Sequence, residues 1–170
     1  INEGFDCVKM KVGSLDFEKE VDILNYIRRK YYNKEILLRV DANGAFKPDE
    51  AMYKMHTMAK SNIHSIEQPI AAGQTELMAQ LCQRTPIDIA LDEELIGVHN
   101  RQEKLELLRL IKPQYIIIKP TLLGGLSSSE EWIQLAEELG IGWWITSALE
   151  SNIGLNAICQ FANEMKAKSY

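Results

Sequence analysis

Short runs rich in β-branched residues alternate with longer amphipathic runs along this chain, and the alternation limits the folds available to it. Helical patterns with short connections separate the β-rich runs; one begins at Pro48, and another is expected to be capped by the serines at 127–129. Strict alternation predicts right-handed crossovers and a parallel sheet, either open or closed as a (β/α) barrel. The predicted strands are residues 7–12, 36–41, 63–67, 87–92, 115–119 and 142–147.

A charged residue ends each of the first five predicted strands, in the order Lys11, Asp41, Glu67, Asp92 and Lys119. Charged groups at the ends of apolar strands are costly to bury unless they are paired or bound to a metal. The strand ends of a barrel converge on one mouth, whereas those of an open sheet lie along a line. We therefore predict a partial TIM-type (β/α) barrel of about six βα units.

The three acids in this series, Asp41, Glu67 and Asp92, have the chemistry of a site for a hard divalent cation. Mg²⁺ prefers oxygen ligands and keeps some positions for water or substrate, and Mn²⁺ is the alternative. Zn²⁺ is disfavoured because no His or Cys ends any of these strands. Any one acid alone could equally be a helix cap or an ion-pair partner, but three at the same phase favour a metal.

The lysines suggest acid–base chemistry. Lys9 and Lys11 alternate on one strand, so both should point to one face, and their repulsion should lower the pKa of whichever is more desolvated. Such a lysine is a competent general base. The alternative is an exposed edge strand with two solvated lysines. Lys119 ends a very apolar strand and needs a partner, either an anionic substrate or the carboxylates.

Two later segments are candidate substrate contacts. Gly124 and Gly125 could present backbone N–H groups to an anion, or form a plain left-handed turn before a helix. The segment with Ser147, Glu150 and Ser151 leads into a helix, and its N–H groups and hydroxyls could hold a carboxylate. A simple capping box is the alternative reading of that segment.

Composition excludes several classes of function. A net charge of -5 and a pI near 5.3 argue against a nucleic-acid partner. No apolar run approaches the roughly 20 residues that span a bilayer. Cys7, Cys82 and Cys159 are odd in number and far apart, which predicts reduced, mostly buried thiols in the cytoplasm. Because the chain opens on Ile1, we expect residues 1–170 to be a single barrel domain that is incomplete at both ends.

Several motifs resemble those of the enolase superfamily, and specifically its muconate-lactonizing subgroup. The stretch 8–11 resembles the Lys-x-Lys motif, 118–125 resembles the motif of the lysine on the sixth strand, and three stretches around the acids resemble the metal-ligand motifs: 40–44, 66–69 and 91–93. Enzymes of this superfamily use a Lys or His base with Mg²⁺ stabilising an enediolate. Within the subgroup, 117–126 and 147–155 look most like the o-succinylbenzoate synthases.

The resemblance implies a Mg²⁺-dependent lyase of menaquinone biosynthesis, acting on a small carboxylate by dehydration through a metal-stabilised enediolate. By position, Lys11 would take the proton and return it to the departing hydroxyl. Lys119 would stabilise the enolate, Lys9 would tune Lys11, and Asn43 would support the site. Alternatives are an N-succinylamino acid racemase or dipeptide epimerase, and a non-catalytic binding domain or inactive fragment. The family's N-terminal capping domain is not in this chain, and an oligomer is compatible with the sequence.

Overall fold

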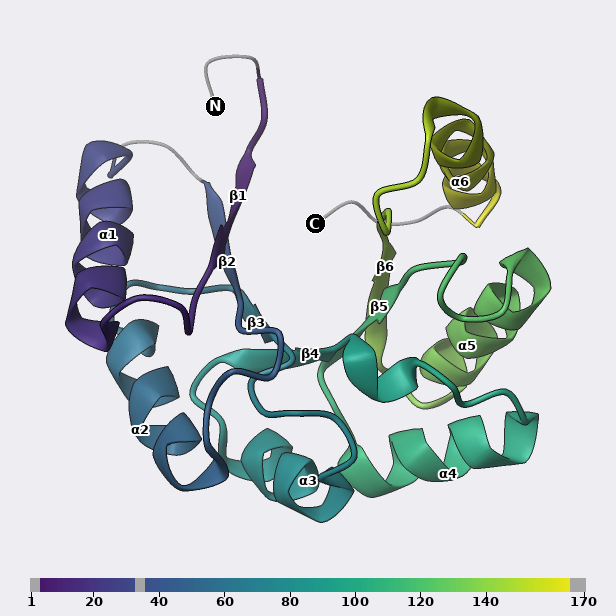
Figure 1. The fold of residues 1–170 in the computed structure, drawn as a ribbon, viewed down its shortest axis with the longest axis horizontal. Helices are drawn as coiled ribbons and strands as arrows, with labels where there is room; N and C mark the ends of the chain where they lie inside the picture. The colour runs from purple at the N-terminus through teal and green to yellow at the C-terminus, as the bar shows by residue number, and fades with distance from the viewer. Residues whose placement is uncertain (1–3, 33–35, 166–170) are drawn as a thin grey trace.

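The computed structural model describes residues 4–32 and 36–165, which form one curved parallel sheet with helices along its outer side (Figure 1). The strands pair in sequence order, each beside the next. The predicted partial (β/α) barrel of six units is confirmed, with each strand one or more residues shorter than expected. The strands are β1 (Cys7–Lys11), β2 (Leu37–Asp41), β3 (Ser65–Glu67), β4 (Asp88–Leu91), β5 (Tyr115–Ile118) and β6 (Gly142–Ile145).

In the described part of the chain, seven helical segments connect and follow the strands. Pro48 occupies the first turn of its helix, as predicted, since its missing N–H needs no partner there. The serines at 127–129 lie inside the first turn of α5 and do not cap it, because Gly125, with φ of 97°, already turns the chain into the helix. The segments are α1 (Phe17–Lys30), α2 (Pro48–Ala59), α3 (Thr75–Arg84), η1 (Glu93–Leu95), α4 (Arg101–Ile111), α5 (Leu126–Glu138) and α6 (Asn152–Glu164).

Within the described residues, no helix combines the length and the apolar character needed to cross a bilayer.

Alternation along each strand separates the core from the site. Leu38 and Val40 of β2 are fully buried in the core beneath the helices, while Arg39 and Asp41 point to the inner side of the curve. The same alternation puts Ile66 in the core and Glu67 inside. Each large apolar side chain buried in this way contributes about 1.5–3 kcal/mol. The outer faces therefore stabilise the strands whose inner faces carry charge.

An interior contact shows how strongly the sheet curls. The guanidinium carbon of Arg39 in β2 lies 4.1 Å from the ring centroid of Trp144 in β6. Trp144 in turn packs against Tyr115 of β5, with ring centroids 5.3 Å apart. In a flat sheet, β2 and β6 would lie about 19 Å apart at the usual strand spacing. The curvature expected of a barrel is thus present.

The turn after β2 is held tightly against the segment after β3. Asn43 and Gly44 have φ values of 42° and 73°, and the Gly44 N–H donates to the carbonyl of Gln68 at 2.7 Å. A Cβ at Gly44 would lie 2.8 Å from the Cα of Ala71. Glycine is therefore required at 44 both by its backbone conformation and by the space available.

Substituting Gly44 should destabilise the fold more than substituting Gly73. Both have left-handed φ, but a Cβ at Gly73 would meet nothing within 4 Å. We expect Gly73→Ala to lower the free energy of unfolding by about 1 kcal/mol, and Gly44→Ala by about 3 kcal/mol because of the added clash. Urea denaturation measures both, and equal losses would show that the backbone contact at Ala71 carries no cost.

Candidate active site

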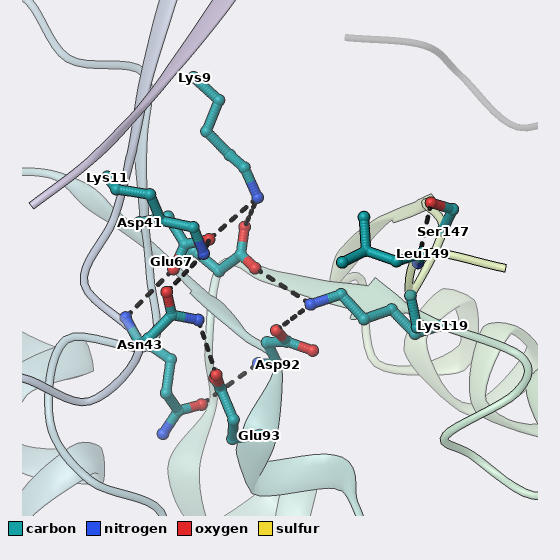
Figure 2. A network of polar contacts seen from close by, with 12 residues as sticks. Lys9, Lys11, Asp41, Asn43, Glu67, Asp92, Glu93, Lys119, Ser147 and Leu149 are labelled. Atoms are coloured by element: carbon teal, nitrogen blue, oxygen red, sulfur yellow. Dashed lines mark hydrogen bonds and ion pairs between the residues drawn. The ribbon is translucent and has the colours of Figure 1, made fainter.

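The five charged residues predicted at the strand ends come together on the inner side of the curved sheet (Figure 2). Lys11 pairs in register with Asp41, and Asp41 with Glu67, so three of them lie on neighbouring strands. Asp92 and Lys119 follow directly after β4 and β5. The convergence that the sequence predicts is therefore observed.

Lysine ammonium groups lie between the carboxylates and pair with them. Lys9 donates to Asp41 Oδ2 at 3.0 Å and to Glu67 Oε2 at 2.8 Å, and Lys11 donates to Asp41 Oδ2 at 2.7 Å. Lys119 lies 3.5 Å from Glu67 Oε1 and is also hydrogen-bonded to Asp92 Oδ2. All three acids are buried, whereas the side chains of Lys9 and Lys11 are 41% and 62% exposed. The site thus consists of buried carboxylates covered by more exposed ammonium groups.

The acids respond differently to this arrangement. Burial acts to raise the pKa of Asp41, but hydrogen bonds from Lys11 and Lys9 outweigh it and hold that pKa below its usual range. Burial raises the pKa of Glu67 to about 7, because Lys9 offsets it only in part, and the charge of Asp41 and a side-chain hydrogen bond with Asp92 add to it. At Glu67, unlike at Asp41, burial therefore outweighs the lysine partner.

The lysine pKa values differ from the sequence expectation. Burial acts to lower the pKa of Lys9, but Glu67 and Asp41 raise it by more, so the net shift is upward. The same balance raises the pKa of Lys119, where Asp92 is the main partner. The prediction that repulsion between Lys9 and Lys11 lowers the pKa of the more buried lysine is wrong for Lys9, because its carboxylate partners are closer and stronger.

The donor set fits a divalent cation. In the described parts of the chain, no three His, Cys, Asp or Glu side chains lie close enough together to hold a metal ion as they stand. The ammonium groups of Lys9 and Lys119 occupy the space between the acids instead. The three buried carboxylates nevertheless offer only oxygen donors, which is the ligand type that Mg²⁺ prefers.

Asn43 links Lys11 to the turn after β2. Its amide oxygen accepts a hydrogen bond from Lys11, and its backbone N–H donates to Asp41 Oδ1 at 3.1 Å. Its amide nitrogen donates to Glu93 Oε1 at 2.8 Å. The supporting position predicted for Asn43 agrees with these contacts. Glu93 has no role in the sequence reasoning, although it follows Asp92 directly in the motif.

Gln68 and Glu94, which the sequence alone did not single out, hold the backbone at Asp92. The buried Gln68 accepts hydrogen bonds from the backbone N–H groups of Asp92 and Glu94, both at 3.2 Å. Its amide nitrogen donates to Glu94 Oε2 at 3.1 Å. Gln68 therefore ties the end of β3, next to Glu67, to the end of β4. Its position directly after Glu67 is the sequence feature that could have identified it.

The residues predicted as substrate contacts near β5 and β6 make hydrogen bonds mainly within their own loops. The Gly125 N–H donates to the carbonyl of Pro120 at 2.8 Å, so it is not free for an anion, and the plain-turn alternative describes it. Glu150 accepts from Thr121 and, at 2.8 Å, from the Ala148 N–H, which joins the loops after β5 and β6. Both carboxylate oxygens are thus used within the protein. Ser147 and Ser151 lie in the same segment, and Gly124 precedes Gly125 in a left-handed conformation.

A family model described as enolase C-terminal domain-like matches residues 1–170. The chain belongs to this family. The predicted membership of the enolase superfamily is confirmed.

Known proteins of the family match this chain over part of their length. It is 50% identical over 159 residues to an o-succinylbenzoate synthase of Desulfotalea psychrophila, covering 94% of this chain and 43% of that protein. The crystal structure of MenC from the same organism superposes with a TM-score of 0.93 at 47% identity, covering 98% and 46%. An L-Ala-D/L-Glu epimerase of Bacillus subtilis is 28% identical over 164 residues, covering 95% and 44%. The chain thus spans less than half the length of these relatives.

The raised pKa of Glu67 predicts a pH-dependent cost to stability in the absence of a divalent cation. Between its ordinary value of 4.5 and about 7, the folded protein holds a proton at Glu67 that the unfolded chain does not. This group therefore lowers stability as pH rises through that window. Glu67→Gln imitates the protonated form at every pH. Its free energy of unfolding should therefore exceed that of the unsubstituted protein by an amount that grows from about 1 to about 3 kcal/mol between pH 5 and pH 8.

Denaturation at a series of pH values, with a chelator present, measures this difference. The exposed Glu103→Gln is the matched control and should follow the unsubstituted protein. Added Mg²⁺ should stabilise the unsubstituted protein at pH 8 and stabilise Glu67→Gln less. If the free energies of unfolding of Glu67→Gln and of the unsubstituted protein changed with pH in parallel, Glu67 would not have a raised pKa in the folded protein.

Proposed function

We propose that this chain is the metal-binding barrel portion of an o-succinylbenzoate synthase. The enzyme would dehydrate 2-succinyl-6-hydroxy-2,4-cyclohexadiene-1-carboxylate to o-succinylbenzoate. One observation carries the acid–base part of the proposal: Lys11 of β1 and Lys119, which directly follows β5, approach the three carboxylates from opposite sides (Figure 2). The 50% identity to a protein with that name supports this reaction over others of the superfamily.

Asp41, Glu67 and Asp92 would hold Mg²⁺, with Mn²⁺ as a substitute. When bound, the ion supplies positive charge to the carboxylate of the substrate and to the negative charge that develops there. The carboxylates are well placed to do this because their strands are fixed by the core behind them. Loss of any one acid would remove one of the three ligands and weaken binding of the cation.

Lys11, as the neutral amine, would remove the proton α to the substrate carboxylate. The electron pair of the broken C–H bond shifts toward the carboxylate. As it returns, the ring C–O bond breaks and a new double bond completes the aromatic ring. The departing hydroxyl takes the proton from the Lys11 ammonium and leaves as water. One lysine thus serves first as base and then as acid.

Lys119 would remain an ammonium group and face the negative charge that builds up on the substrate. Its pKa is raised by Asp92 and Glu67 beyond the lowering effect of burial, which suits a group that must stay protonated. Preorganised charge of this kind stabilises a transition state more than it stabilises the substrate. Lys9, also protonated, would contact the substrate carboxylate from the mouth of the site.

Substrate selection would depend on parts outside the carboxylate cluster. The segment containing Ser147 and Ser151 would line the space for the succinyl tail, with Glu150 holding its loop in place. An N-terminal capping domain in the rest of the protein would close the site, consistent with the chain spanning 43% of its relative.

A second candidate is racemisation or epimerisation of an N-succinylamino acid or a dipeptide. The placement of lysines on both sides favours it, because a two-base mechanism needs one base on each face of the substrate. The 28% identity to an epimerase agrees with this chemistry. The dehydration is favoured by the higher identity to the synthase.

Lys11→Ala in the intact enzyme should reduce the rate of dehydration by at least about 10³-fold, because general acid–base catalysis is lost. Mg²⁺ affinity measured by calorimetry should stay within about threefold, since Lys11 is not one of the acids. Turnover is followed by the absorbance of the aromatic product. Near-normal turnover in the variant would remove Lys11 from the role of base.

The two candidate reactions are separated by comparing substrates in D₂O. For a synthase, the cyclohexadiene carboxylate should give product with a much larger kcat/KM than N-succinyl amino acids show for racemisation. The second candidate predicts the reverse, with deuterium entering the α-carbon of recovered amino acid and no dehydration. That result would replace the first candidate.

A further inference from the structure

Glu93 is a charged residue beside the site that the proposed mechanism does not use. It follows Asp92 and opens the short helix η1. Its Oε1 accepts the hydrogen bond from the amide nitrogen of Asn43 at 2.8 Å, and Figure 2 shows Asn43 between Glu93 and Lys11. Its other oxygen is buried with no hydrogen-bond partner in the described part of the chain. Within the described residues, the Glu93 carboxylate is therefore hydrogen-bonded to one side chain, that of Asn43, which in turn contacts the proposed base Lys11.

The Asn43 amide has two chemically different ends, and its neighbours allow one orientation. The nitrogen end donates to Glu93, and the oxygen end accepts from Lys11. A flipped amide would set its oxygen against the Glu93 carboxylate and its NH₂ group against the Lys11 amine. The first contact joins two acceptors, and it is unfavourable. The carboxylate of Glu93 thus selects which end of the amide faces Lys11.

This orientation matters for a lysine that must act as a base. A neutral amine has two N–H donors and one lone pair. An amide oxygen facing it takes an N–H and leaves the lone pair available to receive a proton. A flipped amide would donate its own N–H to that lone pair and block it. Asn43 therefore assists the base only when its oxygen faces Lys11.

Lys11 also needs an anchor that holds it in place. Its side chain is 62% exposed and its contacts are Asp41 and Asn43. Asp41 belongs to the acids assigned to the cation, so its charge is shared. The turn after β2 fixes Asn43 through its backbone N–H to Asp41, while the amide end is free to rotate unless Glu93 holds it.

We propose that Glu93 is a positioning residue for Lys11, acting through the amide of Asn43. The proposal rests on the proposed function in that Lys11 is taken to move the proton. It predicts that removing Glu93 impairs proton transfer and leaves cation binding unchanged.

The test uses the intact enzyme with Glu93→Ala, Glu93→Gln, Asn43→Ala and the double variant Glu93→Ala/Asn43→Ala. Glu93→Ala should lower kcat about tenfold, within the range usual for residues that orient active-site groups. Glu93→Gln keeps an oxygen acceptor for the Asn43 amide and should restore kcat to within about threefold. Glu103→Ala, an exposed glutamate of α4, is the control for loss of a carboxylate.

The double variant distinguishes a shared pathway from two separate roles. If Glu93 acts through Asn43, the double variant should lose no more activity than Asn43→Ala alone. If the double variant instead lost the product of the two single losses in kcat, about a hundredfold, the two residues would act separately and the proposal would be overturned. So would a Kd for Mg²⁺, measured by calorimetry, that rises in parallel with the fall in kcat, since Glu93 would then support the acids.

Crystal structures of the unsubstituted enzyme and of Glu93→Ala separate this proposal from the proposed function. The expected change is a rotated Asn43 amide and loss of its oxygen contact to Lys11 Nζ. An unchanged contact overturns the positioning role whatever the kinetics. If the unsubstituted enzyme fails to dehydrate the substrate, the proposed function fails, and the two structures still decide whether Glu93 orients Asn43 toward Lys11.

Discussion

Three carboxylates are buried side by side in this protein, and positive charge against them is the condition for their burial. An unpaired charge in a low-dielectric interior is too costly to keep. Here Lys9, Lys11 and Lys119 supply the charge through short contacts to Asp41, Glu67 and Asp92. Burial still raises the pKa of Glu67 to about 7, because its lysine partner offsets the desolvation only in part. Under the proposed function a divalent cation would add positive charge beside Glu67, and the same electrostatic need would link folding to cofactor and catalysis.

The curled sheet makes this cluster possible. Flat parallel strands would place the ends of β1 and β5 too far apart for Lys11 and Lys119 to reach acids that lie within contact of one another. Inside the curve, Arg39 stacks on Trp144 and Trp144 packs on Tyr115, one layer below the acids. Side chains from β2, β5 and β6 therefore meet directly beneath the site, and the layer that supports the curvature also supports the acids above it.

Much of this arrangement could be predicted from the sequence because it depends on local periodicity. An apolar strand that ends in Asp41 or Lys119 already specifies the buried face, the direction of the chain and the position of the charged group. The contacts that were missed or misjudged depend on neighbours distant in the chain. The pKa of Lys9 depends on Glu67, 58 positions away, and the Gly125 N–H is taken by Pro120 through a turn that the residue types alone do not fix. The role proposed for Glu93 depends on its hydrogen bond from Asn43, 50 positions away in the chain.

These longer-range contacts divide into two groups with different consequences. Gln68 and Glu94 connect the backbone of one acid-bearing strand to the next, so they determine where the acids lie. Asn43 and Glu93 hold the exposed side chain of Lys11, so they determine where its ammonium group lies. Under the proposed function, the second group could change while the acids stay in place. Separate control of the acids and of the base would then allow one barrel to support the different proton transfers that the names of its relatives, a synthase and an epimerase, imply.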